Sequence, residues 1–323
     1  MMLNYPSIRQ ALASFLLTVP LLAAAAFPDK AVKLVVPYAP GGSADIAARL
    51  ISEEWAKALG TTIYIENKAG AGGNIGIDSV AKSAADGYTI GLQTVSLAIN
   101  PALFAKMPYD TLKDLAPIGM VATSQHVLVV NKNVQAATTR ELIALLKAQP
   151  GKFSYGSAGS GSTFHMAAEL FKAVAGVAVV HIPYRGGGPA LIDTIGGQVD
   201  MSFPVVSAAQ QHVQSGKLKA IGVTGPKRSA LMPDVPTIAE SGLPAYSFET
   251  WFMVIAPGGT PKPILEKLNA SLNEALGSSK LKERMLKEGF EPIPGTPAQA
   301  RSRLEQELPR WAKLVKDRHI SAE

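Results

Sequence analysis

Along this chain, short runs of β-branched and aliphatic residues alternate with longer stretches in which apolar positions recur every three or four residues. The first pattern is typical of buried strands and the second of amphipathic helices. The alternation predicts an α/β fold with parallel sheets flanked by helices. The predicted strands are Val32–Pro37, Thr61–Glu66, Tyr88–Gln93, Ile118–Val130, Phe153–Ser157, Ala178–Pro183, Val199–Phe203, Leu218–Thr224 and Phe252–Ala256. The predicted helices are Ala44–Leu59, Ile75–Lys82, Arg140–Ala148, Phe164–Ala175, Pro189–Ile195, Val206–Gln214, Lys262–Ala275 and Pro297–Lys316.

One predicted strand, Ile118–Val130, is unusually long. It is β-prone over about 13 residues, whereas strands usually have about 5–6. A strand of that length can leave one sheet and enter another, and Leu218–Thr224 is the predicted return crossing. Two crossings would build one domain from the two ends of the chain and a second from its middle, with a cleft between them. We therefore expect domain 1 to comprise residues 27–124 plus 225–323, and domain 2 to comprise residues 125–224.

Residues 1–26 have the features of a secretory signal peptide. Arg9 supplies a positive start, Ala11–Leu22 is a mostly apolar run, and Ala23–Ala26 offers small residues for cleavage. A membrane anchor would need about 20 unbroken apolar residues, and this run is shorter. We therefore predict cleavage just before Phe27 and export of a soluble protein.

Composition narrows the functional class. With 47% hydrophobic and 17% charged residues, the chain resembles an ordinary soluble globular protein. The net charge of +6 comes from scattered Lys and Arg residues, and glutamates are interleaved with the densest group, residues 280–287. We interpret that group as a solvated helix face and expect no nucleic-acid partner. The absence of cysteine excludes disulfides, a thiol nucleophile and a thiolate metal site.

The segment Val35–Asp45 carries the strongest functional signal. An apolar strand continues past Tyr38 into the Pro-Gly-Gly of residues 40–42 and then into a helix, for which Ser43 is the predicted N-cap. The free N–H groups and the positive dipole end of such a helix start can hold an anion without a charged side chain. An ordinary strand-to-helix turn would have the same sequence, so this segment does not decide the function alone.

A second segment of this kind runs from Ser157 to His165. It also follows a predicted strand and opens a helix. Gly156 and Gly161 have Walker A spacing, but Ser162 stands where the lysine belongs, so a nucleotide site is not favoured. Two uncharged anion sites in different halves of one chain favour a binding role for both. The candidate residues of the second site are Ser157, Gly159, Ser160, Ser162 and Thr163.

Three further segments carry local signals. Ile182–Pro189 follows a strand, and its Tyr184 either hydrogen-bonds a ligand carboxylate or closes the cleft wall. Gly70–Gly76 matches a dinucleotide fingerprint only superficially, and we predict a loop that opens a helix with Asn74 as its cap. Thr138–Glu141 fits a capping box.

Catalytic and metal-binding arrangements have weak support. The five histidines lack metal-ligand spacing, and Ser79–Lys82 matches a β-lactamase tetrad whose partner motifs are absent. His165 could act as a base for Ser157 or Ser160, which keeps an exported serine hydrolase as an alternative function. A structural or ligand-contacting histidine is the commoner case. We expect no metal and no cofactor.

Taken together, these loops resemble those of the Bug family, the periplasmic solute-binding receptors of tripartite tricarboxylate transporters (TctC-like receptors). The resemblance covers essentially the whole chain after residue 26, in order and at consistent spacing. The matching segments are Val36–Asp45, Glu66–Gly76, Asp86–Tyr88, Asn100–Pro101, Gly156–Gly161, His181–Tyr184, Gly196–Met201, Pro233–Thr237 and Ala256–Pro261.

The resemblance implies a two-lobed, type II periplasmic-binding-protein (Venus flytrap) fold with two crossover strands and a central cleft. It also implies a periplasmic, non-catalytic, monomeric receptor that delivers a small organic carboxylate or dicarboxylate to membrane permease subunits. A sensory co-receptor for a membrane kinase would share this cleft and differ only in its partner. The residues expected to hold the carboxylate are Gly41, Gly42, Ser43, Ser157, Gly159, Ser160, Ser162 and Thr163, and those expected to shape the cleft are Tyr38, Phe164, His165, Tyr184 and Pro204.

Two departures from the family pattern bear on the ligand. Phe164 stands where the family commonly has Gln, and Pro204 stands where it commonly has Asp. The missing carboxylate removes a partner for a ligand ammonium, and an inward-facing phenyl ring favours an apolar group. We therefore expect an aromatic or aliphatic carboxylate rather than aspartate or citrate.

Overall fold

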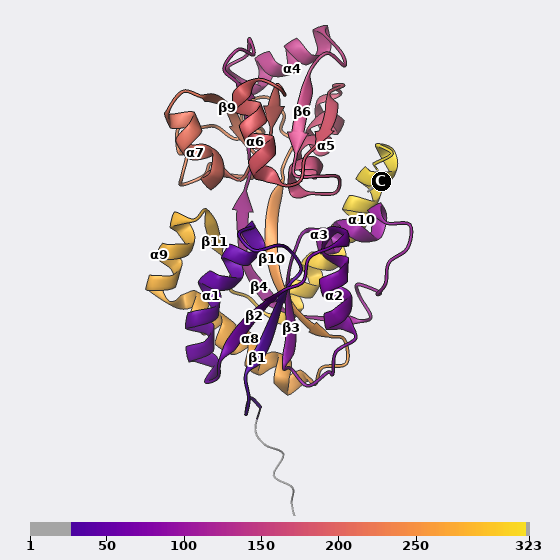
Figure 1. Ribbon diagram of the computed structural model, residues 1–323, viewed down its shortest axis with the longest axis vertical. Coiled ribbons are helices and arrows are strands. Elements are labelled where there is room, and N and C mark those ends of the chain that lie inside the picture. The colour runs from indigo at the N-terminus through magenta and orange to yellow at the C-terminus, as the bar shows by residue number, and fades with distance from the viewer. Residues whose placement is uncertain (1–26, 321–323) are drawn as a thin grey trace, which may run out of the picture.

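The computed structural model describes residues 27–320, so the predicted signal peptide lies outside the described residues. Two sheets follow one another along the long axis of the molecule, each covered by helices (Figure 1). One sheet has six strands in the order β11-β4-β10-β3-β1-β2, and the other has five in the order β7-β6-β8-β5-β9. We call the six-stranded sheet with its helices the first lobe and the five-stranded sheet with its helices the second lobe.

The strands of the first lobe are β1 (Val32–Val36), β2 (Ile63–Asn67), β3 (Thr89–Thr94), β4 (Leu115–Gln125), β10 (Glu249–Pro257) and β11 (Phe290–Pro292). Its helices are α1 (Ser43–Leu59), η1 (Ala71–Gly73), α2 (Asn74–Ala81), α3 (Ser96–Leu103), α8 (Lys262–Gly277), α9 (Ser279–Lys287) and α10 (Pro297–Asp317). The strands of the second lobe are β5 (Val127–Asn131), β6 (Ser154–Ser157), β7 (Val180–Pro183), β8 (Met201–Ser202) and β9 (Leu218–Val223). Its helices are α4 (Thr139–Ala148), α5 (Thr163–Ala175), α6 (Gly187–Gly196) and α7 (Val206–Gln214).

The α/β class is confirmed, but the prediction of parallel sheets is wrong in part. Strand β1 runs parallel to β2 and β3, and β6 runs parallel to β7 and β8. Strand β10 is antiparallel to β3 and β4, β11 is antiparallel to β4, and β5 is antiparallel to β8 and β9. The antiparallel pairs centre on β4, β5 and β10, the strands through which the chain passes between the lobes.

The long β-prone run does cross between the lobes, but as two strands. Strand β4 ends at Gln125 and β5 starts at Val127, with His126 between them. The predicted return crossing is wrong, because β9 stays in the second sheet and β10 makes the return (Figure 1). Thr224 joins the two crossings, since its hydroxyl accepts from the His126 N–H at 3.0 Å and its carbonyl accepts from the Phe248 N–H at 2.8 Å.

Residues 225–248, which we assigned to domain 1, pack against the second lobe. Thr237 forms a β-bridge with Val223, and the Tyr246 hydroxyl donates to the Ala167 carbonyl in α5 at 3.1 Å. The segment also contacts the first lobe, because Lys227 pairs with Glu291 of β11 at 2.6 Å and the Ser247 carbonyl accepts from Arg310 of α10 at 2.7 Å. The chain itself re-enters the first sheet at β10.

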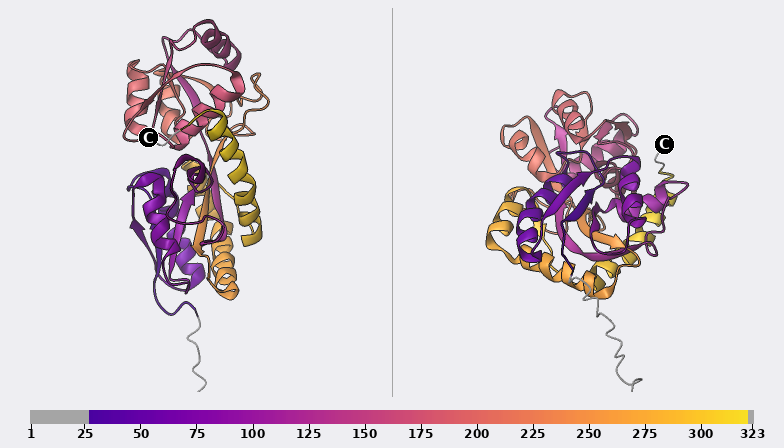
Figure 2. Two further views of the ribbon diagram at one scale, coloured as in Figure 1. Left: turned by 90° about the vertical axis from the view of Figure 1, so that its right-hand side faces the viewer. Right: turned by 60° about the horizontal axis from the view of Figure 1, so that its bottom comes forward.

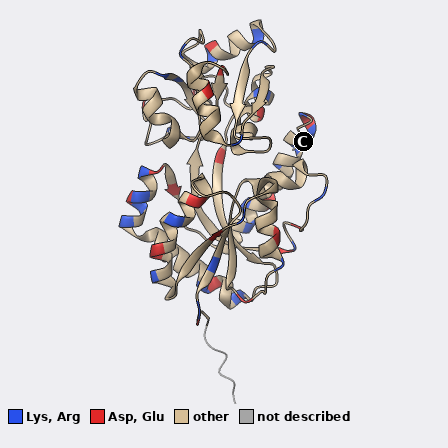
Figure 3. Cartoon of the chain, viewed as in Figure 1, with Lys and Arg blue, Asp and Glu red and all other residues tan. Residues whose placement is uncertain are grey.

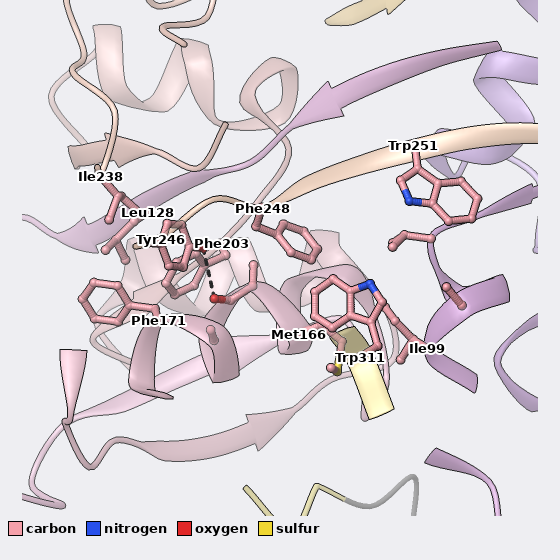
Figure 4. Packing of buried hydrophobic residues seen from close by; sticks show 14 of the residues in the cluster. Ile99, Leu128, Met166, Phe171, Phe203, Ile238, Tyr246, Phe248, Trp251 and Trp311 are labelled. Carbon is pink, nitrogen blue, oxygen red and sulfur yellow. Dashed lines mark hydrogen bonds between the residues drawn. The ribbon is translucent and has the colours of Figure 1, made fainter. Parts of the chain in front are cut away.

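The hydrophobic core continues from one lobe to the other beside α10. This helix runs lengthwise along the first lobe, and its C-terminal end points toward the second lobe (Figure 2). Trp311 of α10 lies among Ile99 of α3, Met166 of α5 and Phe248 in one cluster (Figure 4). The Phe248 and Trp311 rings meet edge to face with centroids 5.7 Å apart. The lobes are thus joined by packed side chains as well as by two strands.

All eight predicted helices are present, with ends that differ by a few residues, and the helix face inferred at residues 280–287 is α9. The elements α3, η1 and β11 were not predicted. Helix α3 is buried along most of its length and contains Pro101, so it has no amphipathic period to detect. None of the helices in the described part of the chain is long and apolar enough to cross a membrane.

Three predicted helix caps need correction. Gly42 rather than Ser43 is the N-cap of α1, and Gly73 rather than Asn74 is the N-cap of α2. The Thr138 hydroxyl caps α4 by accepting from the Glu141 N–H, but the Glu141 carboxylate accepts from the N–H of Ala137 and not from that of Thr138. Only half of the predicted capping box therefore forms.

Candidate functional site

A cleft of about 590 Å³ lies between the two lobes. Both lobes supply its walls through the loops that follow their strands. The residues from the first lobe are Tyr38, Ala39, Pro40, Gly41, Gly42, Ser43, Ala44, Gly72, Thr94, Ser96, Asn100 and Phe104. Those from the second lobe are Ala158, Ser160, Gly161, Ser162, Thr163, Phe164, Gly186, Gly187, Gly188, Leu191, Pro204, Val205 and Ala208.

The first wall is the loop between β1 and α1. Gly41 has φ +83°, a conformation that side chains disfavour, and Gly42 is extended and caps the helix. The Gly41 N–H donates to the Asp45 carboxylate at 2.9 Å, which turns it away from a ligand. The first N–H groups of α1, at Ser43 and Ala44, have no partner within the helix. They are the donors that this wall offers to the cleft.

Asp45 is itself held by two further donors. The Arg49 guanidinium donates to it at 2.9 Å, and so does the Asn67 side-chain amide at 2.9 Å. Burial raises the pKa of Asp45, but the hydrogen bonds from Arg49, Gly41 and Asn67 outweigh it and hold that pKa below its usual value. Asp45 is therefore a carboxylate at neutral pH, compensated by Arg49 beside it.

The opposite wall is the loop between β6 and α5. Ser162 is the N-cap, and its hydroxyl accepts from the His165 N–H at 3.3 Å. Gly161, just before the cap, has φ +76° and donates its N–H to Nδ1 of His165 at 3.0 Å. Ser160, Ser162 and Thr163 face the cleft. The layout repeats that of the first wall, in which the glycine before the cap donates to the third residue of the helix.

Five of the helices that the structure describes begin at this cleft. Ser43 starts α1, Ser96 starts α3, Thr163 starts α5, Gly187 starts α6 and Val205 caps α7, and each of these residues lines the cleft. The N-terminus of a helix carries about half a positive charge and unpaired N–H donors. The cleft is therefore electropositive through its backbone.

No Asp, Glu, Lys, Arg or His is among the described residues that line the cleft. The charged side chains gather instead on outer helices such as α9 (Figure 3). In residues 27–320 there is also no group of three His, Cys, Asp or Glu side chains placed to hold a metal ion. The chemistry available in the cleft is hydrogen bonding to an anion and contact with apolar groups.

The sequence was compared with protein families and with known proteins. The model of the tripartite tricarboxylate transporter family receptor matches residues 47–320. The chain belongs to this receptor family. It is 40% identical over 293 residues to Protein BugT of Bordetella pertussis, with 90% of each chain covered.

Two solved structures show the same fold with ligands. The R. palustris protein Rpa4515 with adipate has a TM-score of 0.82 at 35% identity, over 91% of this chain and 99% of that one. MatC from Rhodopseudomonas palustris with bound malate has a TM-score of 0.79 at 33% identity, over 90% and 100%. Both the Bug-family resemblance and the two-lobed periplasmic-binding-protein fold are confirmed for this receptor.

The receptor brings most of the predicted site residues to one cleft. Those that line it are Tyr38, Gly41, Gly42, Ser43, Ser160, Ser162, Thr163, Phe164 and Pro204. The Phe164 ring also packs on the α6 turn, since a Cβ built on Gly187 would lie 2.6 Å from its Cζ. The ring is thus held in place as part of the cleft wall.

Four predicted residues lie behind the wall instead. Ser157 is fully buried and hydrogen-bonds Nε2 of His181 at 2.6 Å. The Gly159 N–H donates to the Ser157 hydroxyl at 3.1 Å, and Tyr184 donates its hydroxyl to Asp193 at 2.7 Å. Nδ1 of His165 accepts a hydrogen bond from the Gly161 N–H. These polar groups are used within the second lobe, so they support the loop and do not face the cleft.

The serine–histidine pair of the hydrolase alternative does not form. Its proposed base, His165, bonds the loop backbone through Nδ1, and Ser157 pairs with His181 where solvent does not reach it. Among the described residues, no hydrogen bond joins Ser160 to either imidazole.

Sequence reasoning missed the part of the wall that follows β3. The Tyr38 hydroxyl donates to Gln93 at 2.5 Å and lies 3.0 Å from the Thr94 hydroxyl. Burial raises the pKa of Tyr38, so its phenol stays protonated. Thr94 and Ser96 extend the same polar network at 3.3 Å. The one available signal was the polar Gln-Thr at the end of a buried strand.

Proposed function

We propose that this protein is an extracytoplasmic receptor that captures a small organic carboxylate in the cleft and delivers it to the permease of a tripartite transporter. The observation that carries the proposal is the convergence of five helix N-termini on a cleft to which residues 27–320 contribute no charged lining residue. The related proteins solved with adipate and malate support the ligand class.

The energetics support binding without a charged partner. A helix N-terminus stabilises an anion by about 0.3–1 kcal/mol when exposed and about 2 kcal/mol when partly buried. Hydrogen bonds to a charged group add about 1.5–3 kcal/mol each. Several helix N-termini and several such hydrogen bonds together contribute more than the roughly 8 kcal/mol that corresponds to micromolar binding. The excess offsets part of the free-energy cost of association. We place the carboxylate between the starts of α1 and α5, with Ser43, Ser162 and Thr163 as donors.

The rest of the ligand is proposed to be apolar. The second lobe presents Phe164, Leu191, Pro204, Val205 and Ala208 to the cleft, and the first lobe presents Phe104. The part of the chain that the structure describes contributes no carboxylate to the lining that could bind an ammonium group. This wall supports an aliphatic or aromatic carboxylate, with amino acids and citrate disfavoured by desolvation of their additional charges.

Delivery requires that the lobes close on the ligand. We propose hinge points at His126 and near Phe248, where the chain crosses between lobes and Thr224 links the two crossings. The proposed domains are then those predicted, except that residues 225–248 move with the second lobe. The same proposal includes export by the signal peptide, a periplasmic location, a monomeric state and absence of catalysis. If the protein is instead a sensory co-receptor, the same closed form would bind a membrane kinase.

A thermal-shift screen tests the proposal. Terephthalate, adipate, nicotinate, citrate and aspartate are each added to the purified protein without its signal peptide. A ligand that binds only the folded form raises Tm. We expect terephthalate, adipate or nicotinate to raise Tm and calorimetry to give one site per chain. A shift with citrate or aspartate alone would overturn the apolar ligand, and no shift with any carboxylate would count against the receptor.

A further inference from the structure

Three nearly parallel rings lie behind the loop between β6 and α5. His165 of α5 and His181 of β7 stack with centroids 4.1 Å apart and an interplanar angle of 15°. Tyr155 of β6 stacks on His181 at 4.8 Å and 16°. His165 is buried and lies outside the cleft lining, so this stack faces the loop from the protein side.

Both imidazoles are hydrogen-bonded to the loop. Nδ1 of His165 accepts the Gly161 N–H at 3.0 Å, and an amide N–H can only donate. Nε2 of His181 lies 2.6 Å from the Ser157 hydroxyl, which itself accepts the Gly159 N–H at 3.1 Å. The Ser157 hydrogen is then free to point at His181. This network requires His165 with its hydrogen on Nε2. The Ser157 hydroxyl has two acceptor lone pairs and fits either role toward His181, and we infer the tautomer with the hydrogen on Nδ1, in which Ser157 donates to Nε2.

The surroundings keep both rings neutral. The charged groups facing them are Glu169 and Lys172, which pair with each other at 2.5 Å, and Glu169 also accepts from the Tyr155 hydroxyl at 2.7 Å. Burial, reinforced by His181, lowers the pKa of His165 to about 4, and burial lowers the pKa of His181. At neutral pH the two imidazoles are therefore available as acceptors.

We propose that His165 and His181 are positioning residues for the anion-binding loop. By accepting from residues 157–161 on the protein side, they hold the loop so that Ser160, Ser162 and Thr163 face the cleft. Protonation would place an N–H donor of His165 against the N–H donor of Gly161, and the loop would have to move. This inference rests on the proposed function, because it assigns the loop to a carboxylate.

The chain allows a matched test, because two amides reproduce the required acceptors. His165→Asn places an oxygen near Nδ1, and His181→Gln places one near Nε2, without a titratable group. His165→Leu keeps the volume and removes the acceptor. Nitrogen-15 NMR of the ligand-free protein reads the tautomers and follows the Gly159 and Gly161 amide signals from pH 7.5 to 4.

We expect the two stated tautomers and an acid-dependent shift of the Gly161 signal that His165→Asn abolishes. The opposite tautomers, or an unchanged Gly161 titration in His165→Asn, would overturn the proposal. These readouts do not depend on any ligand, so a receptor that binds no carboxylate would refute the proposed function and leave this result standing.

Calorimetry with adipate then links the loop to binding. At pH 7.5 we expect His165→Leu to weaken binding about tenfold and the double variant His165→Asn/His181→Gln to stay within about threefold of wild type. From pH 7.5 to 4.5 the wild type should lose affinity and the double variant should lose less. Equal affinity of His165→Leu and wild type, with both folded by circular dichroism, would contradict the positioning role.

Discussion

The two walls of the cleft share one backbone design and differ in the side chain that braces it. In each, a glycine just before the helix cap donates its N–H to the third helical residue, Gly41 to Asp45 and Gly161 to His165. In the first lobe the acceptor is a carboxylate backed by Arg49. In the second it is a neutral imidazole stacked on His181. The same turn is therefore held by groups that lose their acceptor form in different pH ranges.

The largest expected difference between the two walls lies in how the free energy of unfolding depends on pH. Burial lowers the pKa of His165 to about 4, as it does for His126 between β4 and β5. Because an unfolded histidine titrates near 6.5, the unfolded state binds the proton first as pH falls. Stability is thus lost from about pH 6.5 to 4, by about 3 kcal/mol at most for each of these histidines. Urea unfolding between pH 7.5 and 3 measures this loss as a fall in the free energy of unfolding.

The first wall should respond only below that range. The pKa of Asp45 is held below its usual 3.8, so its stabilisation is present above that value and is lost as pH falls through the lowered pKa. His165→Asn/His181→Gln should flatten the slope between pH 6.5 and 4, whereas Asp45→Asn should change only the slope below about pH 4. Identical profiles for the two variants would show that the walls are not braced independently.

Adding a charge to the first wall should nearly abolish binding. Gly42→Asp places a carboxylate at the helix start, and an added Cβ meets only the Ala39 carbonyl at 3.6 Å, so the fold tolerates it. We expect at least about a 100-fold loss of carboxylate affinity by calorimetry, from like-charge repulsion and bulk. Gly277→Asp, where an added Cβ meets nothing within 4 Å, is the control. Unchanged affinity in Gly42→Asp would remove this wall from the site.

A change on the second wall should alter ligand choice. Phe164→Gln replaces an apolar lining group, and we expect about tenfold weaker binding of an aliphatic or aromatic carboxylate, in line with the loss of a buried apolar contact. Ile192→Gln on α6 is the control, because Ile192 is 67% exposed and does not line the cleft. If both variants bind equally well, the ring does not contact the ligand.

The smallest effect concerns the buried carboxylate itself. Asp45→Asn keeps an acceptor for Gly41, removes a negative charge close to the bound anion and removes the ion pair with Arg49. We expect carboxylate affinity to rise about threefold at low salt and the gain to shrink in 0.5 M NaCl, since salt screens the interaction. Weaker binding would mean that the charge of Asp45 is needed to order the turn.

The sequence allowed correct prediction of the local features. Eight helices, most strands and both glycine-rich loops follow from hydrophobic period and turn chemistry, which depend on near neighbours. Prediction from the sequence failed for α3, because a helix buried on most sides has no amphipathic period. It also failed for β9 and β10, because the strands with which they pair decide which of them crosses between the lobes. The family pattern also located the cleft residues of the first wall, because they are contiguous in the chain.

Only the tertiary structure decided which polar groups remain available to a ligand. Ser157, Gly159 and His165 have side chains or N–H groups suited to an anion, yet each is already paired. The Ser157 hydroxyl bonds His181 from a different strand, the Gly159 N–H donates to that hydroxyl, and Nδ1 of His165 accepts from Gly161. Thr94 carries only the signal of a polar residue at a strand end and Ser96 carries none, and both reach the cleft because β3 lies beside β1. A hydrogen-bonding group can be read from sequence, but whether it is already paired depends on contacts between distant segments, since buried polar groups take whatever partner folding brings to them.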